Sequence, residues 1–141
     1  MKILGIDHIG IAVNDIEKML GFYIRTLGLR FGGIEEIPDR HLKVGFIDNS
    51  ESSPSAKTRI ELIEPTSPES TVAKFIAKRG EGIHHLCFHV DDIEEAIGQL
   101  VKGGFELIDR IPRRGAENSK IAFIHPKSTG GVLIELKQLP K

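Results

Sequence analysis

A short sequence pattern occurs twice in this chain. Residues 7–17 read DHIGIAVNDIE, and residues 84–94 read HHLCFHVDDIE. In both copies a histidine opens an alternating run, a valine ends it, and an Asx-Asp-Ile-Glu sequence follows. The two histidines, His8 and His85, are 77 residues apart (85 − 8 = 77). One copy of so short a pattern would carry little information, but two copies in a small chain indicate two equivalent structural modules.

Each half of the chain is expected to follow the order strand, helix, three strands. Period-two alternation predicts strands over residues 3–13 and 83–90, and apolar residues at spacings of three and four predict the helices that follow. Asn14 or Asp15 is expected to cap the first helix, and Asp91 or Asp92 the second. Further strands are expected over residues 29–36, 44–47, 58–64, 105–111, 120–125 and 132–137, with loops over 48–57 and 112–118.

The expected fold class is α+β, with two tandem βαβββ modules whose curved mixed sheets form one metal-containing cleft. At 141 residues the chain is long enough for a single domain with a real core. We expect a first module over residues 1–65, a helical connector over 66–81 and a second module over 82–141.

The composition excludes several classes of function. With 19 basic and 20 acidic residues, the formal net charge is −1, which argues against a nucleic-acid binder. No apolar run approaches the ~20 residues of a membrane span, and the N-terminal residues show no signal-peptide pattern. We therefore expect a cytoplasmic protein with no membrane partner. The single cysteine, Cys87, excludes an internal disulfide and a cysteine-rich zinc site.

A second pair of matching residues lies on the strands expected to close each half. Both strands carry the sequence Ile-Glu-Leu, centred on Glu61 and Glu135, which are 74 residues apart (135 − 61 = 74). An acid between two apolar neighbours on a strand points away from the core face. One histidine and one glutamate per module, His8 with Glu61 and His85 with Glu135, make a ligand set for zinc, cobalt, nickel, manganese or iron(II). Singly, each residue would favour a structural histidine or a solvated glutamate, but the repeated quartet favours a metal site.

Other polar residues are weaker candidates. His84 should leave the strand on the face opposite to His85, which favours a structural role. His89 shares the face of His85 but lies about 13 Å along the strand, too far to ligate the same ion. Cys87 is expected to be a packed thiol and not a nucleophile. The basic group forms either a solvated loop or a clamp for an anionic substrate tail; it comprises Arg110, Arg113, Arg114 and Lys120.

The doubled pattern resembles the vicinal oxygen chelate superfamily, which is the glyoxalase and bleomycin-resistance group. Within it, the chain is most similar to the methylmalonyl-CoA epimerases, through residues 7–13, 78–86 and 125–136. The last segment, HPKSTGGVLIEL, is the most specific, because the superfamily at large does not share that loop. The resemblance covers nearly the whole chain.

The resemblance implies an isomerase that interconverts the C2 epimers of methylmalonyl-CoA by two-base proton transfer through an enediolate. It implies a divalent metal ion, with cobalt first in vitro and zinc, manganese or nickel as alternatives. The ligands implied are His8, Glu61, His85 and Glu135. It further implies an acyl-CoA substrate and a homodimer.

The resemblance also implies two proton-transfer bases. Glu135 on the last strand is one of them. The other is an acidic residue in the loop before the third strand, where Asp39 is the only acid in register. Many family members have glutamate, a polar residue and glycine there, whereas this chain has Asp39, Arg40 and His41. Because of this departure, Glu35, Glu36 and His41 remain alternatives to Asp39.

Two other functions fit the same expected fold. One is a glyoxalase I-like isomerase of glutathione hemithioacetals, and the other is a non-catalytic resistance protein that sequesters a small molecule. The loop over residues 127–131 favours the epimerase over the first alternative. The intact ligand quartet argues against the second.

Overall fold

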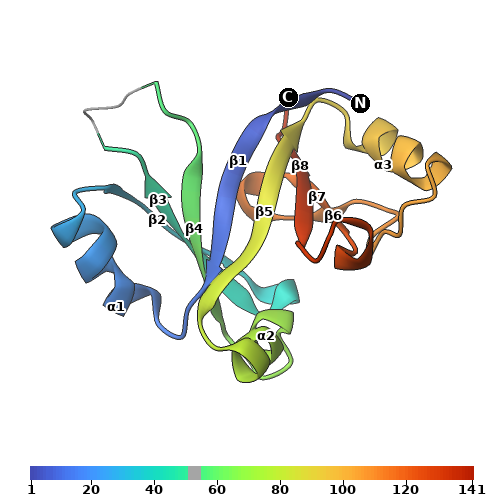
Figure 1. Cartoon of the computed structure of the whole chain (residues 1–141). Coiled ribbons are helices and arrows are strands. Elements are labelled where there is room, and N and C mark those ends of the chain that lie inside the picture. The colour runs from blue at the N-terminus through green and yellow to red at the C-terminus, as the bar shows by residue number, and fades with distance from the viewer. Residues whose placement is uncertain (51–54) are drawn as a thin grey trace. The chain divides into compact units, whose positions relative to one another are not determined.

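The computed structural model describes residues 1–50 and 55–141, and these residues form two compact units. The first unit consists of residues 8–84, and the second of residues 1–7 and 85–141. The loop expected over residues 48–57 includes residues 51–54, which lie outside the described residues. Helices and strands combine into an α+β fold, as the sequence predicts, and Figure 1 labels them.

The first unit contains a mixed sheet with the strand order β2-β3-β4-β1. Strand β1 (Ile3–Ala12) runs parallel to β4 (Arg59–Pro65), which pairs antiparallel with β3 (Leu42–Asp48), and β3 pairs antiparallel with β2 (Arg30–Ile37). Helix α1 (Ile16–Leu20), which continues as a π-helical segment over Gly21–Thr26, packs on one face of this sheet (Figure 1). Helix α2 (Thr71–Arg79) follows β4.

Local chemistry explains where α1 begins and how closely it packs. The Asp15 carboxylate accepts a hydrogen bond from the Lys18 backbone N–H at 3.3 Å. Of the two residues expected to cap this helix, Asn14 and Asp15, the cap is therefore Asp15. Gly45 on β3 faces the helix, and a Cβ there would lie 2.8 Å from Ile16 Cγ2. Glycine at this position therefore lets α1 contact the strand directly. The resulting core contains Val13, Ile16, Ile47 and Leu62.

The second unit contains a mixed sheet with the strand order β5-β8-β7-β6. Strand β5 (Gly82–Val90) runs parallel to β8 (Ile134–Gln138), while β7 (Lys120–Ile124) is antiparallel to both β8 and β6 (Arg113–Arg114). Helix α3 (Ile93–Lys102) begins at Asp92, whose carboxylate accepts from the Glu95 N–H at 3.0 Å. It packs on the sheet face that carries Ala122, Ile124 and Leu136.

The prediction of a strand over residues 105–111 was wrong. In that stretch only Leu107 forms a bridge, to Ile124, and the strand β6 lies within residues 112–118, where a loop was expected. The reason is that the N–H groups of Ile108 and Asp109 both donate to the Phe123 carbonyl, at 2.9 and 3.3 Å. The Asp109 carboxylate in turn accepts from the Phe123 N–H at 2.9 Å, so a side chain replaces the backbone ladder.

Among the described residues, no helix is long and apolar enough to cross a membrane.

Candidate metal centre

In the first unit, His8 and Glu61 form a buried pair. His8 Nδ1 lies 3.0 Å from Glu61 Oε2, and the two residues are only 2% and 4% exposed. The pairing of Gly10 with Glu61 in the β1–β4 ladder places both side chains on one face of the sheet. Leu62, the neighbour of Glu61, packs with α1 on the other face. The Ile-Glu-Leu sequence thus directs the acid away from the core, as predicted.

In the second unit, His85 and Glu135 form the corresponding pair. His85 Nε2 lies 3.0 Å from Glu135 Oε1, and each residue is 5% exposed. The Phe123 and His85 rings pack in a T-shaped arrangement, with the ring centroids 5.7 Å apart. Leu136 packs with α3 on the opposite face, so the same alternation directs Glu135.

The two pairs occupy equivalent positions in their ladders. In the first unit the partner of the glutamate is Gly10, two residues after His8, and in the second it is Cys87, two residues after His85. The sequence repeat is therefore also a repeat of geometry. Each pair offers a ring nitrogen and a carboxylate oxygen, both of which are common ligands of divalent transition metals. The donor set of each unit therefore fits half of the predicted metal site.

Arg59 adds a positive charge beside the first pair. Its Nη2 lies 3.6 Å from Glu61 Oε2, and its Nη1 lies 3.8 Å from Asp48 Oδ1. The guanidinium carbon lies 4.8 Å from the centre of the Phe46 ring. Arg59 was not predicted from the sequence, although its position two residues before Glu61 on the same strand places it on the same face.

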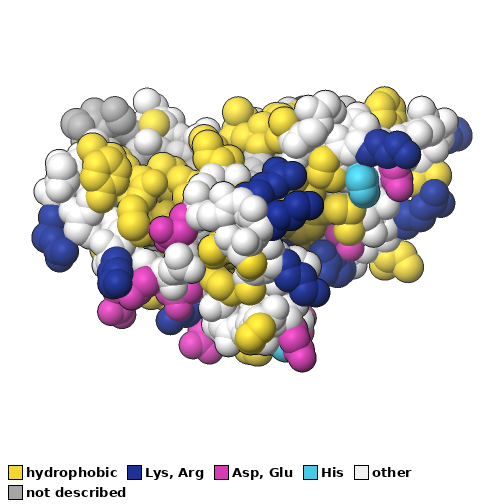
Figure 2. Space-filling model, turned by 60° about the horizontal axis from the view of Figure 1, so that its bottom comes forward, with side chains coloured by type: hydrophobic (Ala, Val, Ile, Leu, Met, Phe, Trp, Pro, Cys, Tyr) yellow, Lys and Arg dark blue, Asp and Glu magenta, His cyan; other side chains and the backbone are white. Residues whose placement is uncertain are grey.

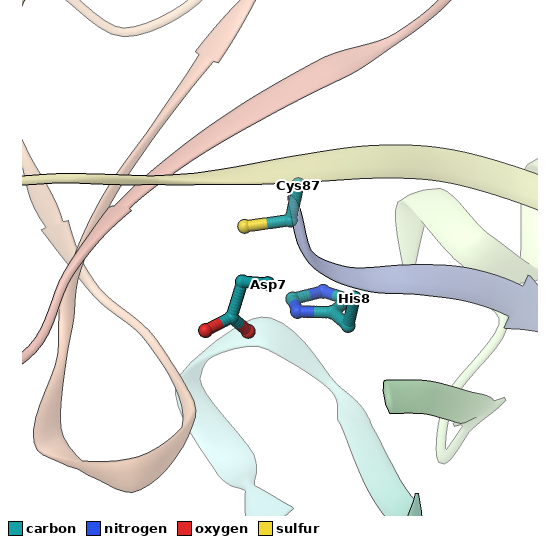
Figure 3. A group of neighbouring side chains, drawn as sticks. All are labelled: Asp7, His8 and Cys87. Atoms are coloured by element: carbon teal, nitrogen blue, oxygen red, sulfur yellow. The ribbon is translucent and has the colours of Figure 1, made fainter. Parts of the chain in front are cut away.

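A buried lysine lies beside the second pair. Lys137, two residues after Glu135 on β8, is 1% exposed, and its Nζ lies 3.1 Å from Asp7 Oδ1 and 2.9 Å from Glu117 Oε1. A carboxylate oxygen of Asp7 lies within 4.8 Å of Cys87 Sγ; Figure 3 shows these two side chains and His8, the residue after Asp7 on β1. Cys87 is fully buried, in agreement with a packed thiol.

Asp39 lies in an exposed turn before β3. It belongs to a short 3-10 turn over Pro38–Arg40 that immediately precedes β3. On β3, Leu42 pairs with Pro65 whereas Phe46 pairs with Glu61. The strand rise therefore separates the Asp39 end of β3 from the partner of Glu61 by about 13 Å. The pairing register does not bring Asp39 close to Glu61.

Among the alternatives to Asp39, Glu35 lies on the same sheet face as Glu61. Glu35 pairs with Val44, and Val44 pairs with Ile63, two residues after Glu61 on β4. Paired residues of an antiparallel ladder share a face, as do residues two apart on one strand.

The other two alternatives have different surroundings. Glu36 pairs with Lys43, whose Nζ lies 3.3 Å from Glu64 Oε2, and this set lies on the opposite face of the sheet. His41 is exposed, has a left-handed backbone with φ 54°, and its Nε2 lies 3.8 Å from Glu69.

His84 and His125 have structural contacts. His84 packs edge-on against Phe75, with ring centroids 4.9 Å apart, which agrees with the structural role expected for it. His125 Nδ1 accepts a hydrogen bond from the Lys127 N–H at 3.0 Å and so caps the turn over Pro126–Ser128. This turn opens the loop that leads into β8. Gly130 and Gly131 continue the loop with φ of 73° and 91°, a backbone conformation that favours glycine.

A two-module α+β fold with one buried imidazole–carboxylate pair per module is the arrangement expected for the vicinal oxygen chelate class. The chain matches the family described as Glyoxalase/Bleomycin resistance protein/Dioxygenase superfamily over residues 7–123, and it belongs to this superfamily.

Relatives of the chain include named epimerases. It is 36% identical over 136 residues to an ethylmalonyl-CoA/methylmalonyl-CoA epimerase of Cereibacter sphaeroides, covering 95% of this chain and 97% of that protein. It is 40% identical over 131 residues to the uncharacterized protein YqjC of Bacillus subtilis, covering 93% and 89% of the two chains. The crystal structure of methylmalonyl-CoA epimerase from Mycobacterium tuberculosis aligns with a TM-score of 0.91 at 36% identity, covering 99% of this chain and 90% of that chain.

Proposed function

We propose that this protein is an isomerase that interconverts the C2 epimers of methylmalonyl-CoA. The observation that carries the proposal is the buried His–Glu pair that recurs at the equivalent ladder position of each module. The similarity to epimerases over nearly the whole chain supports the substrate class, because the match includes both modules. A homodimer and a cytoplasmic location remain predictions.

We propose that His8, Glu61, His85 and Glu135 together hold one divalent metal ion, with cobalt as the first candidate. Zinc, manganese and nickel are alternatives with the same ligand preferences. When bound, such an ion supplies Lewis-acid stabilisation of negative charge that develops on the thioester and carboxylate oxygens of the substrate. Carboxylates from both modules help to balance the charge of the ion.

Side chains of the protein must remove and return the proton at C2 of the substrate. That carbon lies between a thioester and a carboxylate, so its proton is only moderately acidic. Epimerisation needs a base on one side of C2 to remove the proton and an acid on the opposite side to return a proton. We propose Glu135 for one of these roles. Removal of the C2 proton gives an enediolate, which is the intermediate between the two proton transfers.

For the second base we propose Glu35 ahead of Asp39. Glu35 shares the sheet face of Glu61 through the β2–β3–β4 register, and lies two strands away, about 10 Å across the sheet. Asp39 lies beyond the end of β3. A carboxylate on the face of the metal ligands is better placed to reach a substrate bound there than one in the exposed turn.

Glu35→Gln should therefore slow exchange of the C2 hydrogen in deuterated water by about 10²–10⁴-fold, the usual contribution of general base catalysis. Proton NMR of methylmalonyl-CoA measures this rate. Glu36→Gln is the matched control, because it removes the same charge from the opposite face. If Asp39→Asn slows exchange and Glu35→Gln does not, the second base is Asp39.

The metal requirement gives a direct test of the proposed function. With cobalt bound, the protein should catalyse C2 exchange and epimerisation, and a chelator should lower both rates by at least ~100-fold, with recovery on adding cobalt or manganese. The visible absorption of bound cobalt follows loading independently of activity. A protein that binds no metal and gains no activity would support the non-catalytic binding protein.

The competing enzymes of the same fold are separated by substrate. Turnover of the methylglyoxal–glutathione hemithioacetal without turnover of methylmalonyl-CoA would establish the glyoxalase I-like isomerase. Ethylmalonyl-CoA belongs in the same assay, because the Cereibacter relative carries both substrates in its name.

A further inference from the structure

The two modules differ at one position beside their His–Glu pairs. Their glutamates are 74 residues apart, so Arg59 on β4 corresponds to Leu133, which immediately precedes β8 (133 − 59 = 74). The ladder positions around these two residues match, because in each module the residue before the glutamate pairs with the residue after the histidine. A phenylalanine, Phe46 or Phe123, pairs with the glutamate in both modules. The first module therefore adds a cation at a position that is apolar in the second.

Arg59 lies on the sheet face that carries the first pair. It is the ladder partner of His8, and it stands two residues before Glu61 on the same strand. Its Nη2 lies 3.6 Å from Glu61 Oε2, the same oxygen that lies 3.0 Å from His8 Nδ1. The guanidinium is thus directed at a carboxylate oxygen of a proposed metal ligand.

Other side chains hold the guanidinium beside Glu61. Its carbon lies 4.8 Å from the centre of the Phe46 ring in a cation–π contact. Its Nη1 lies 3.8 Å from Asp48 Oδ1, and because Asp48 is 35% exposed, water screens this contact. Figure 2 shows lysine and arginine side chains at several separate places on one face of the molecule, whereas the Arg59 side chain is only 22% exposed. Arg59 therefore differs from an ordinary surface cation.

A guanidinium beside a carboxylate competes with a metal ion for the same negative charge. Glu61 is only 4% exposed, so water screens little of its interaction with Arg59. A carboxylate that shares its charge with an arginine neutralises a bound divalent cation less than an unshared carboxylate does. Less neutralisation at the ligands leaves more positive charge to stabilise the substrate oxygens.

We propose that Arg59 is a positioning residue that acts through Glu61, by competing with the metal ion for its carboxylate. Arg59 thereby weakens metal binding and raises the rate of proton removal at C2. This inference rests on the proposed function, because it assumes that Glu61 is a ligand of a catalytic metal ion. A residue that only stabilised the ligands would have the opposite effect on metal binding, because its loss would loosen them.

Equilibrium binding of cobalt, measured by visible absorption against a competing chelator, tests the proposal without turnover. Arg59→Gln should lower the Kd for cobalt by about tenfold, whereas Arg59→Lys keeps the charge and should stay within about twofold of the wild type. Arg30→Gln is the matched control, because Arg30 pairs with Asp48 on the same sheet face but lies two strands, about 10 Å, from β4. It should leave the Kd within about twofold of the wild type.

A double variant tests whether Arg59 acts through Glu61. In the Glu61→Gln background, Arg59→Gln should change the Kd for cobalt by less than about twofold, because the amide has no charge for which the two cations compete. Weaker cobalt binding by Arg59→Gln, or equally tightened binding in both backgrounds, would overturn the proposal.

Deuterium incorporation at C2 of methylmalonyl-CoA tests the effect on catalysis. At saturating cobalt, Arg59→Gln should lower the exchange rate by about tenfold, and Arg30→Gln should match the wild type. An exchange rate of Arg59→Gln equal to that of the wild type would show that Arg59 does not raise the rate of proton removal, against the proposal. If the cobalt affinities follow the prediction but the loaded wild type exchanges no C2 hydrogen, the proposed function fails while the role of Arg59 at the metal centre stands.

Discussion

Replacement of Glu135 by Gln is expected to lower epimerisation of methylmalonyl-CoA by at least about 10³-fold. The amide keeps the size of the side chain but cannot take up a proton, and loss of a general base alone costs about 10²–10⁴-fold. The same change also removes a negatively charged oxygen from the proposed ligand set. Glu135 is buried and contacts His85 at 3.0 Å, so few other groups can replace it.

Glu61→Gln is the comparison that separates the two roles of Glu135. Glu61 occupies the equivalent ladder position in the first unit, is similarly buried and contacts its own histidine at 3.0 Å. We propose it only as a metal ligand, so its replacement should weaken cobalt binding and lower activity at saturating cobalt by at most about tenfold. Cobalt absorption measures loading of both variants, and deuterium incorporation at C2 measures proton transfer. Equal losses of exchange in the two fully loaded variants would remove the base role of Glu135.

The parts of the fold that the sequence predicts well are those with local signals. The strands around His8 and His85 have clear alternation, and each following helix begins at a capping aspartate, Asp15 or Asp92. The Ile-Glu-Leu sequences place Glu61 and Glu135 on the faces opposite to the helices, because a strand alternates its side chains.

The sequence is less informative where pairing between distant strands decides the outcome. The apolar residues of 105–111 look like a strand, but the Asp109 side chain takes the hydrogen bond of the Phe123 N–H and ends the ladder. The sequence favours Asp39 as the second base by analogy with the loop before β3. The register favours Glu35 instead, because face and distance depend on the pairing of Glu35 with Val44.

Lys137 is the clearest example of a feature that depends on residues distant in the sequence. A lysine near the end of a strand is normally exposed, because burial of an ammonium group without partners is costly. The partners of this lysine are Asp7 and Glu117, which are 130 and 20 residues away in the sequence. No local pattern connects them, so neither its burial nor its ion pairs could be predicted.

Replacement of Lys137 by Met should lower the free energy of unfolding by about 3 kcal/mol. Methionine fills a similar volume, but it removes the ion pair between Lys137 and Asp7, whose side chain is only 13% exposed. Glu117 is more exposed, at 37%, so solvent compensates part of its loss. Glu117 also has a left-handed backbone with φ 61°, which a residue other than glycine adopts only at a cost that its ion pair helps to offset.

A double-mutant cycle tests whether the lost stability comes from the buried charge of Asp7. Asp7→Asn in the Lys137→Met background should recover about 1 kcal/mol or more, because it removes the charge that Lys137→Met leaves buried. Lys102→Met, an exposed change of the same type on α3, should stay within about 0.5 kcal/mol of the wild type. Urea unfolding followed by circular dichroism measures the free energies of the wild type, the single variants Lys137→Met and Asp7→Asn, the double variant and Lys102→Met. If Lys137→Met is as stable as Lys102→Met, or if Asp7→Asn lowers the stability of Lys137→Met further, the ion pairs of Lys137 do not stabilise the fold in this way.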